Sequence, residues 1–114
     1  MWIFTTSGFV SAVQDRNDRT IIVRSRDRAS LEQISTMFQV SINQTPLADY
    51  PYRIFLKREE FVTWISTEAS AIDYHNFKSE VAAIRGKKFS RTLGDVWSTM
   101  IQVEDITARK GVHR

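Results

Sequence analysis

Residues 43–61, NQTPLADYPYRIFLKREEF, constrain the fold most, because the hydrophobic pattern changes within them from a period of two to a helical period. The segment PLAD is typical of a turn that follows a strand in VSINQT, and the alternation in YPYRIFLK is typical of a second strand. The acidic residues of REEF favour the first turn of a helix, where they complement the helix dipole. The stretch therefore predicts a β-hairpin that leads directly into a helix.

The same alternation assigns the side chains of the predicted strand to two faces. One face carries Tyr50, Tyr52, Ile54 and Leu56, and the other carries Pro51, Arg53, Phe55 and Lys57. Because aliphatic side chains share their face, we expect both tyrosines to face the core, with their hydroxyls at its rim. Tyr50 and Tyr52, with Arg53, are also a candidate binding site, because RNA-binding sheets use aromatic pairs for stacking. If that face is open, it is a large apolar patch that a partner should cover.

Two further strands are predicted before this hairpin. WIFTTSGFVSAVQ, residues 2–14, is typical of a strand, or of a strand broken at Ser7-Gly8, because a glycine within a strand pattern often marks an interruption. RTIIVRSRD, residues 19–27, is the second strand of a first hairpin. LEQISTMF then has helical spacing, and Ser30 is a plausible N-cap for it.

Three amphipathic helical patterns follow the second hairpin, and Gly86 separates the last two. The predicted order is therefore β-β-α-β-β-α-α-α. This order indicates an α+β fold with a single four-stranded, mostly antiparallel sheet and with helices packed on one face. We predict one domain over residues 1–105 and a basic, flexible tail over residues 106–114.

The composition excludes several classes of site. The 114 residues include no cysteine, so disulfides, thiolate metal sites and cysteine nucleophiles are excluded. No apolar run approaches the roughly 20 residues of a membrane helix, and the start of the chain does not resemble a signal peptide. We therefore expect a cytoplasmic protein that is not embedded in a membrane. A net charge of +3 is only mildly basic.

Several blocks, taken together in this order, resemble a known family. They are MWIFTTSGFVSAVQ, IIVRSRDRASLE, TPLADYPYRIFL, AIDYHNFK and VWSTM, and they span almost the whole chain. The chain is similar to small uncharacterised bacterial proteins that are frequent in actinobacteria and their phages. The family pattern often has a proline at the position of His75 and a different charged run at DRND. The resemblance implies a stand-alone cytoplasmic domain and no particular activity.

Two basic clusters are candidates for nucleic-acid binding. Arg24 and Arg26 share one face of their strand, with Arg28 at its end, and such a row could follow phosphates. In RGKKFSR, the basic residues Lys87, Lys88 and Arg91 surround an aromatic residue on which a base could stack. Alternatively, the arginines pair with acids across an exposed strand face, and the lysines form the solvated side of a helix bend.

No pattern indicates a cofactor, a metal site or a catalytic group. The segment DYHN, with Asp73 and His75, lacks a nucleophile or a metal ligand nearby. An enzyme or small-ligand site built from these two residues with Asp49, Tyr52 and Arg53 is therefore the weakest hypothesis, and we lean against an enzyme. The preferred hypothesis is a protein-interaction or regulatory module that binds a host protein or itself as a homodimer. The alternative is a nucleic-acid-binding domain that uses the two basic clusters.

Overall fold

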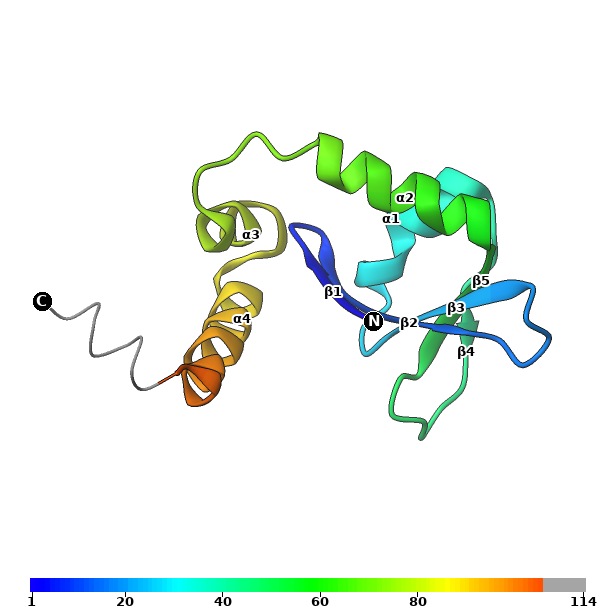
Figure 1. The fold of residues 1–114 in the computed structure, drawn as a ribbon, viewed down its shortest axis with the longest axis horizontal. Coiled ribbons are helices and arrows are strands. Elements are labelled where there is room, and N and C mark those ends of the chain that lie inside the picture. The colour runs from blue at the N-terminus through cyan, green and yellow to red at the C-terminus, as the bar shows by residue number, and fades with distance from the viewer. Residues whose placement is uncertain (106–114) are drawn as a thin grey trace, which may run out of the picture. The chain divides into compact units, whose positions relative to one another are not determined.

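The computed structural model describes residues 1–105. Its elements in chain order are β1 (Trp2–Thr5), β2 (Gly8–Gln14), β3 (Thr20–Ser25), α1 (Ala29–Phe38), β4 (Asn43–Gln44), β5 (Tyr52–Lys57), α2 (Arg58–Ser70), α3 (Phe77–Arg85), α4 (Lys87–Thr99) and the short 3₁₀ helix η1 (Met100–Val103) (Figure 1). They belong to two compact units, Met1–His75 and a second unit that begins at Asn76. The predicted α+β class is confirmed. The single domain over residues 1–105 stays a prediction, and the predicted tail lies outside the described residues.

The first unit contains a five-stranded antiparallel sheet in the order β1-β2-β3-β5-β4. The prediction of four strands was wrong, because residues 2–14 fold back on themselves instead of forming one long strand. Thr5 pairs with Gly8, so the break expected near Ser7-Gly8 is a tight hairpin between β1 and β2. β4 is only two residues long and borders β5 at the far edge of the sheet.

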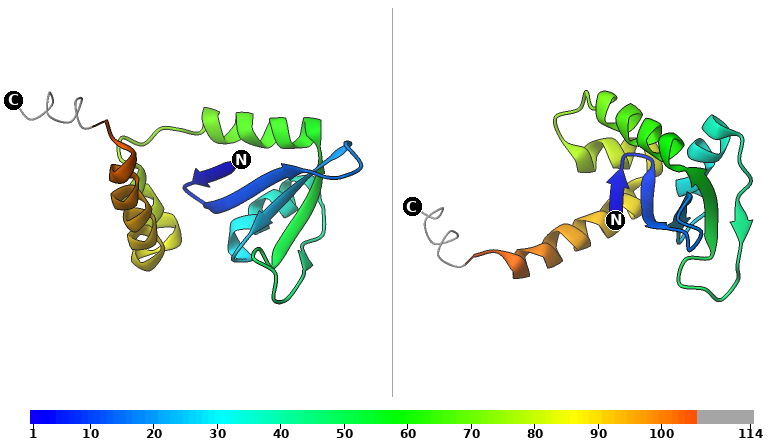
Figure 2. Two further views of the ribbon diagram at one scale, coloured as in Figure 1. Left: turned by 60° about the horizontal axis from the view of Figure 1, so that its bottom comes forward. Right: turned by 45° about the vertical axis from the view of Figure 1, so that its right-hand side comes forward.

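The core lies between the strands and the first two helices. Figures 1 and 2 show α1 and α2 beside the sheet, and both helices contact β3 and β5. Leu31 and Ile34 of α1 and Trp64 of α2 join one hydrophobic cluster with strand residues. The strand members of that cluster are Val10, Ala12, Ile21, Val23, Ile54 and Leu56. They occupy alternate positions along each strand, as a half-buried sheet requires.

Local hydrogen bonds explain where the first helices begin. The backbone N–H of Lys57 donates to Oε1 of Glu60 at 2.8 Å, and the acidic residues lie in the first turn of α2 as predicted. Ser30, in contrast, is not the N-cap of α1. It lies inside the helix, where its hydroxyl donates to Oδ1 of Asp27 at 2.6 Å and accepts from the backbone N–H of Phe9 at 3.2 Å. Ser30 therefore joins the helix to β2.

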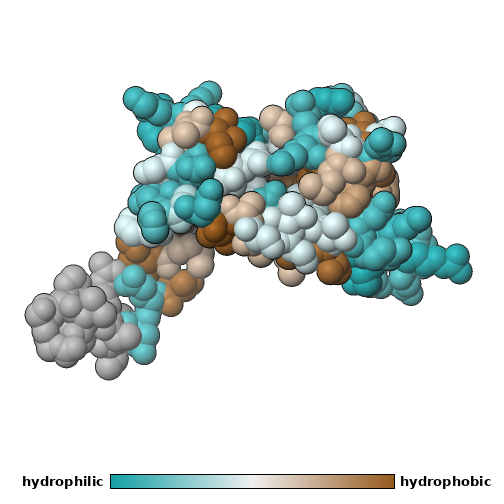
Figure 3. Space-filling view, turned by 90° about the horizontal axis from the view of Figure 1, so that it is seen from above, coloured by the Kyte–Doolittle hydropathy of each residue, from teal (hydrophilic) through white to brown (hydrophobic). Residues whose placement is uncertain are grey.

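The second unit is a pair of helices followed by η1. Asn76 caps α3 by accepting the backbone N–H of Ser79 at 2.9 Å, and Gly86, with φ of 94°, separates α3 from α4 as predicted. Among the residues of this unit up to 105, Val81 and Leu93 are the buried apolar ones. Figure 3 shows hydrophobic surface beside the grey residues, where the end of α4 and η1 lie. Among residues 1–105, no helix has the length and apolar composition needed to cross a membrane.

Candidate nucleic-acid interface

The strand side chains that point away from the hydrophobic cluster form a surface of unusual composition, called here the arginine face. Its members follow from the strand register and the alternation of side chains and are Trp2, Phe4, Phe9, Ser11, Val13, Thr20, Ile22, Arg24, Asn43, Arg53, Phe55 and Lys57. Three of these residues are basic, four are aromatic and none is acidic. The face is therefore electropositive and rich in rings.

Arg24 and Arg53 lie directly opposite each other on β3 and β5 at the centre of this face. Like charges in this position destabilise a sheet. The part of the chain that the structure describes offers neither guanidinium a carboxylate. Nη2 of Arg24 donates to Oγ of Ser11 at 2.9 Å, and Nη2 of Arg53 donates to the backbone oxygen of Tyr50 at 3.5 Å. The prediction that strand arginines pair with acids does not hold for Arg24.

The Nε atoms of both arginines are buried and have no hydrogen-bond partner in the described structure. A buried donor without an acceptor costs roughly 1–3 kcal/mol. Two such donors lie on facing residues, and both belong to guanidinium groups, which donate hydrogen bonds and cannot accept them. An anion that accepts from both guanidiniums would relieve the repulsion, and it would supply acceptors to the buried Nε donors once the two side chains turn toward it.

Tyr50 covers one end of the arginine pair. Its ring centroid lies 4.8 Å from Cζ of Arg24 and 5.3 Å from Cζ of Arg26. Nη1 of Arg26 also donates to the backbone oxygen of Asp49 at 3.2 Å. Cation–π contacts of this kind orient a guanidinium without neutralising it. The β4–β5 loop therefore holds two arginines in place and leaves their charges available.

Tyr50 and Tyr52 lie on different faces of the sheet. The prediction that they share one face was therefore wrong. Tyr50 precedes β5 and stacks on Arg24, so the alternation that begins at Tyr52 does not apply to it. Tyr52 faces the other way and packs against the hydrophobic cluster, as predicted. Arg28 is exposed at the N-cap position of α1 and does not join the arginine face.

Aromatic rings border the arginine pair on both sides. On β1 and β2, the rings of Phe4 and Phe9 stack with centroids 4.6 Å apart, and Trp2 meets Phe9 edge to face at 5.7 Å. Trp2 is 69% exposed, although it is large and apolar. On the other side, Phe55 is 41% exposed. Sequence analysis missed Trp2, Phe4 and Phe9 because the pairing of β1 with β2 was not assigned.

The second predicted cluster lies in the second unit. Lys87, Lys88 and Arg91 are exposed on the first turns of α4. Cζ of Arg85 lies 4.1 Å from the ring centroid of Phe89, which is half-buried and therefore not a free stacking surface. The three exposed cations project from one helix and have no adjacent exposed ring. The cluster is a weaker candidate than the arginine face.

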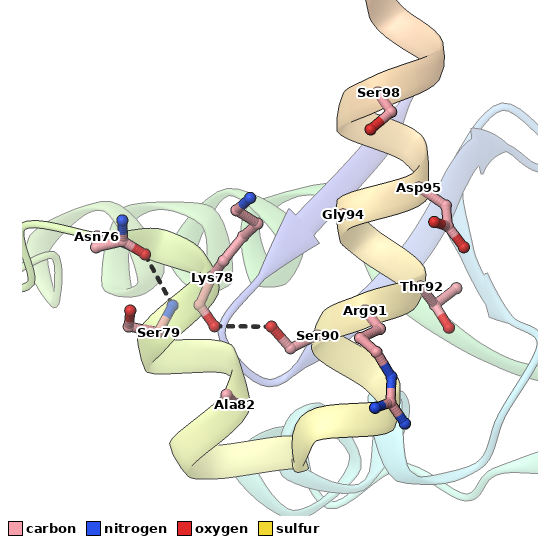
Figure 4. Close-up of a pocket in the computed structure, with 10 residues that line it drawn as sticks. All are labelled: Asn76, Lys78, Ser79, Ala82, Ser90, Arg91, Thr92, Gly94, Asp95 and Ser98. Atoms are coloured by element: carbon pink, nitrogen blue, oxygen red, sulfur yellow. Dashed lines mark hydrogen bonds between the residues drawn. The ribbon is translucent and has the colours of Figure 1, made fainter.

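A polar groove runs between α3 and α4 (Figure 4). Oγ of Ser90 donates to the backbone oxygen of Lys78 at 2.9 Å and ties the two helices together. Of the predicted site residues, only Arg91 lines the groove, and its guanidinium lies at one end in Figure 4. The lining also holds Lys78, whose ammonium lies at the opposite end in Figure 4, together with Asp95 and short polar side chains, so its two positive charges are not clustered.

The residues of the enzyme hypothesis are not brought together. Tyr52 and Arg53 are consecutive in β5 and point to opposite faces of the sheet. Asp73 and His75 are exposed beyond the far end of α2, and the 13 residues of that helix span roughly 20 Å. Within residues 1–105, no group of three acidic or histidine side chains could hold a metal ion.

The first unit has a hollow of 210 Å³ between β1 and the end of α2, and Glu68 is one of the residues that line it. Burial raises the pKa of the Glu68 carboxyl above its usual value of 4.5. The nearby Trp64 indole opposes this shift, although its Nε1 makes no hydrogen bond of ordinary geometry. The folded chain thus holds this proton more tightly than the unfolded chain does.

This raised pKa predicts a pH dependence of stability. Because the folded protein binds the proton more tightly, its free energy of unfolding falls as the pH rises from the unfolded pKa through the raised folded pKa. Glu68→Gln cannot ionise, so it should remove this fall and be more stable than the wild type at pH 7. Urea unfolding at several pH values checks this, and parallel profiles for the two proteins would contradict it.

Comparison of the chain with protein-family models, with curated proteins and with solved structures finds no match. The similarity to small actinobacterial and phage proteins therefore stays a prediction. The chemistry of the arginine face is the basis for assigning a function.

Proposed function

We propose that the first unit binds single-stranded nucleic acid on the arginine face. In this proposal α1 and α2 cover the face that carries Val23 and Ile54, and the opposite face of the sheet is open to the ligand. The observation that carries the proposal is the facing pair of Arg24 and Arg53, which has buried, unpaired Nε donors and no carboxylate partner among the described residues. We also propose a cytoplasmic location, with which a chain lacking cysteine is compatible.

A phosphate fits the chemistry of the arginine pair. Side chains opposite each other on antiparallel strands have Cβ atoms about 5 Å apart, so two guanidiniums can donate to different oxygens of one phosphate. Planar guanidiniums match phosphate geometry and form charge-assisted hydrogen bonds, which are stronger than neutral ones. Tyr50 restricts Arg24 beforehand, which lowers the entropy lost when the phosphate binds.

The exposed rings suggest why the ligand is single-stranded. Unpaired bases present their flat faces, and stacking of one base on an aromatic side chain contributes about 1–3 kcal/mol. Trp2 is exposed on β1, in the same cross-strand row as Ser11, Arg24 and Arg53, and Phe55 is exposed on β5, two residues beyond Arg53. A strand whose phosphate lies on Arg24 and Arg53 could place neighbouring bases on these rings. Bases within a duplex are already stacked on each other and cannot use them.

Binding of labelled 20-nucleotide oligothymidine and oligouridine, compared with a duplex of the same length, tests the proposal. We expect the single strands to bind more tightly than the duplex, with an affinity that falls steeply as the salt concentration rises, because bound phosphates release counterions. Fluorescence anisotropy across a series of salt concentrations measures both quantities. Equal binding of duplex and single strand, or no binding at low salt, would contradict it.

Protein binding by the second unit is the second candidate function, in keeping with the interaction module that the sequence favours. Along α4 and η1, Trp97 is 62% exposed and Met100 is 55% exposed. These residues continue the helical stripe that begins with the buried Leu93. A partner protein retained after nuclease digestion, and lost when Trp97 is replaced by serine, would favour this function.

A further inference from the structure

The outer edge of β1 carries backbone groups without partners. The backbone N–H and C=O of Met1 both bond to Ala12, and such bonded pairs alternate along an antiparallel ladder. Ile3 and Thr5 therefore bond inward to β2, whereas Trp2 and Phe4 direct their N–H and C=O groups outward. Within the first unit, no hydrogen bond reaches these four outward groups.

The two edges of the sheet differ in their protection. β4 has only two residues, and Pro46 follows it closely. β1, WIFT, contains no charge, no proline and no bulge. Natural proteins use short strands, charges, prolines or bulges to prevent an edge from pairing with another chain. The edge formed by β1 has no charge, proline or bulge that would prevent it from pairing with a strand of another chain.

We infer that β1 pairs in antiparallel fashion with β1 of a second copy of this chain. The strand is complementary to itself, because Trp2 and Phe4 are equally spaced about Ile3. With Ile3 of both copies on the two-fold axis, Trp2 of each copy lies opposite Phe4 of the other. Each such pair exchanges two backbone bonds, so all four outward groups of each copy are satisfied. No side chain of β1 is charged, so none repels the other copy.

This pairing would join the two arginine faces. A two-fold axis perpendicular to the sheet keeps equivalent faces on the same side, so the strands of both copies form one continuous sheet. Trp2 of one copy then meets Phe4 of the other as a cross-strand aromatic pair, a type that stabilises sheets. The pairing itself does not depend on nucleic acid, but its role in lengthening the binding face rests on the proposed function.

Substitutions at Phe4 test the pairing. Phe4→Pro removes an outward N–H and no bond inside the sheet, whereas Phe4→Ala removes the same ring and keeps the N–H. Light scattering coupled to size-exclusion chromatography at about 100 μM, where micromolar dimers persist, should give twice the 13.2 kDa of one chain for the wild type. We expect Phe4→Pro to be monomeric and Phe4→Ala to stay largely dimeric.

A wild-type mass of one chain, or equal behaviour of the two variants, would overturn the inference. Hydrogen exchange of the wild type provides a test that needs no variant. The amides of Trp2 and Phe4 should be protected at high protein concentration and exchange faster on dilution, and concentration-independent exchange would also overturn the inference. A dimer that binds no oligonucleotide would contradict the proposed function alone, and a monomer that binds would contradict the pairing alone.

Discussion

Replacing both Arg24 and Arg53 by alanine is expected to lower the affinity for single-stranded oligonucleotides about 100-fold. Each arginine supplies a charged hydrogen-bonding group whose loss costs roughly 1.5 kcal/mol, and every 1.4 kcal/mol is a factor of ten in the dissociation constant. If the two residues contact two phosphate charges, the slope of log affinity against log salt should also become shallower by about 1.4. Fluorescence anisotropy at several salt concentrations measures both effects.

The matched control is Lys87→Ala with Lys88→Ala, which removes the same amount of charge from the exposed start of α4. We expect this variant to bind within about threefold of the wild type, because screened charges outside the site contribute little at physiological salt. A larger loss from the lysine pair than from the arginine pair would move the site to α4 and contradict the assignment to the sheet.

Loss of binding in the arginine variant should not result from unfolding. The two guanidiniums repel each other across β3 and β5, and both Nε donors are unpaired. Removing them should leave the melting temperature unchanged or raise it, as is typical of residues kept for function at a cost in stability. A melting temperature that falls by several degrees would show that the arginines stabilise the sheet.

Trp64→Ala is expected to lower the free energy of unfolding by about 3–5 kcal/mol, the usual cost of removing a large buried ring. Trp64 is 2% exposed and belongs to the hydrophobic cluster shared by the strands and α1. Its ring also lies 5.9 Å from that of Phe61. Since small domains are stable by only about 5–15 kcal/mol, this one change should remove a large part of the stability.

Trp64→Phe is the matched control for this core residue. It keeps an aromatic ring in the core and removes an indole Nε1 that is buried without a hydrogen-bond partner, so it should cost much less than the alanine variant. Urea unfolding followed by circular dichroism measures both variants. A loss below about 1 kcal/mol for Trp64→Ala would mean that α2 does not pack on the sheet as described.

Local patterns predicted the elements that depend on neighbouring residues. The alternation in β5, the acidic start of α2 and the break at Gly86 are all set within a few residues, and the structure contains each of them. Ser30 shows the limit of this reasoning. Its spacing relative to the apolar residues suggested a cap, but its hydroxyl bonds to Asp27 and to Phe9 of β2, a contact that no local pattern contains.

The candidate site depends on pairing between distant strands. Arg24 and Arg53 face each other only because β3 pairs with β5 across the intervening α1 and β4. Both arginines were predicted site residues, but in different sites. Arg24 was grouped with Arg26 and Arg28, and Arg53 was grouped with the two tyrosines. Strand order could not be read from periodicity, which fixes the face of each side chain and not its neighbour across the sheet.

The most direct test of the phosphate site is a nuclear magnetic resonance titration that follows the Nε–Hε signals of arginine side chains as oligothymidine is added. The proposal predicts that the signals of Arg24 and Arg53, whose Nε atoms lack acceptors in the free protein, shift as the oligonucleotide binds. Those of Arg16 and Arg19 in the exposed β2–β3 loop should move little. Unchanged Arg24 and Arg53 signals at saturating oligonucleotide would contradict the claim that this pair holds a phosphate.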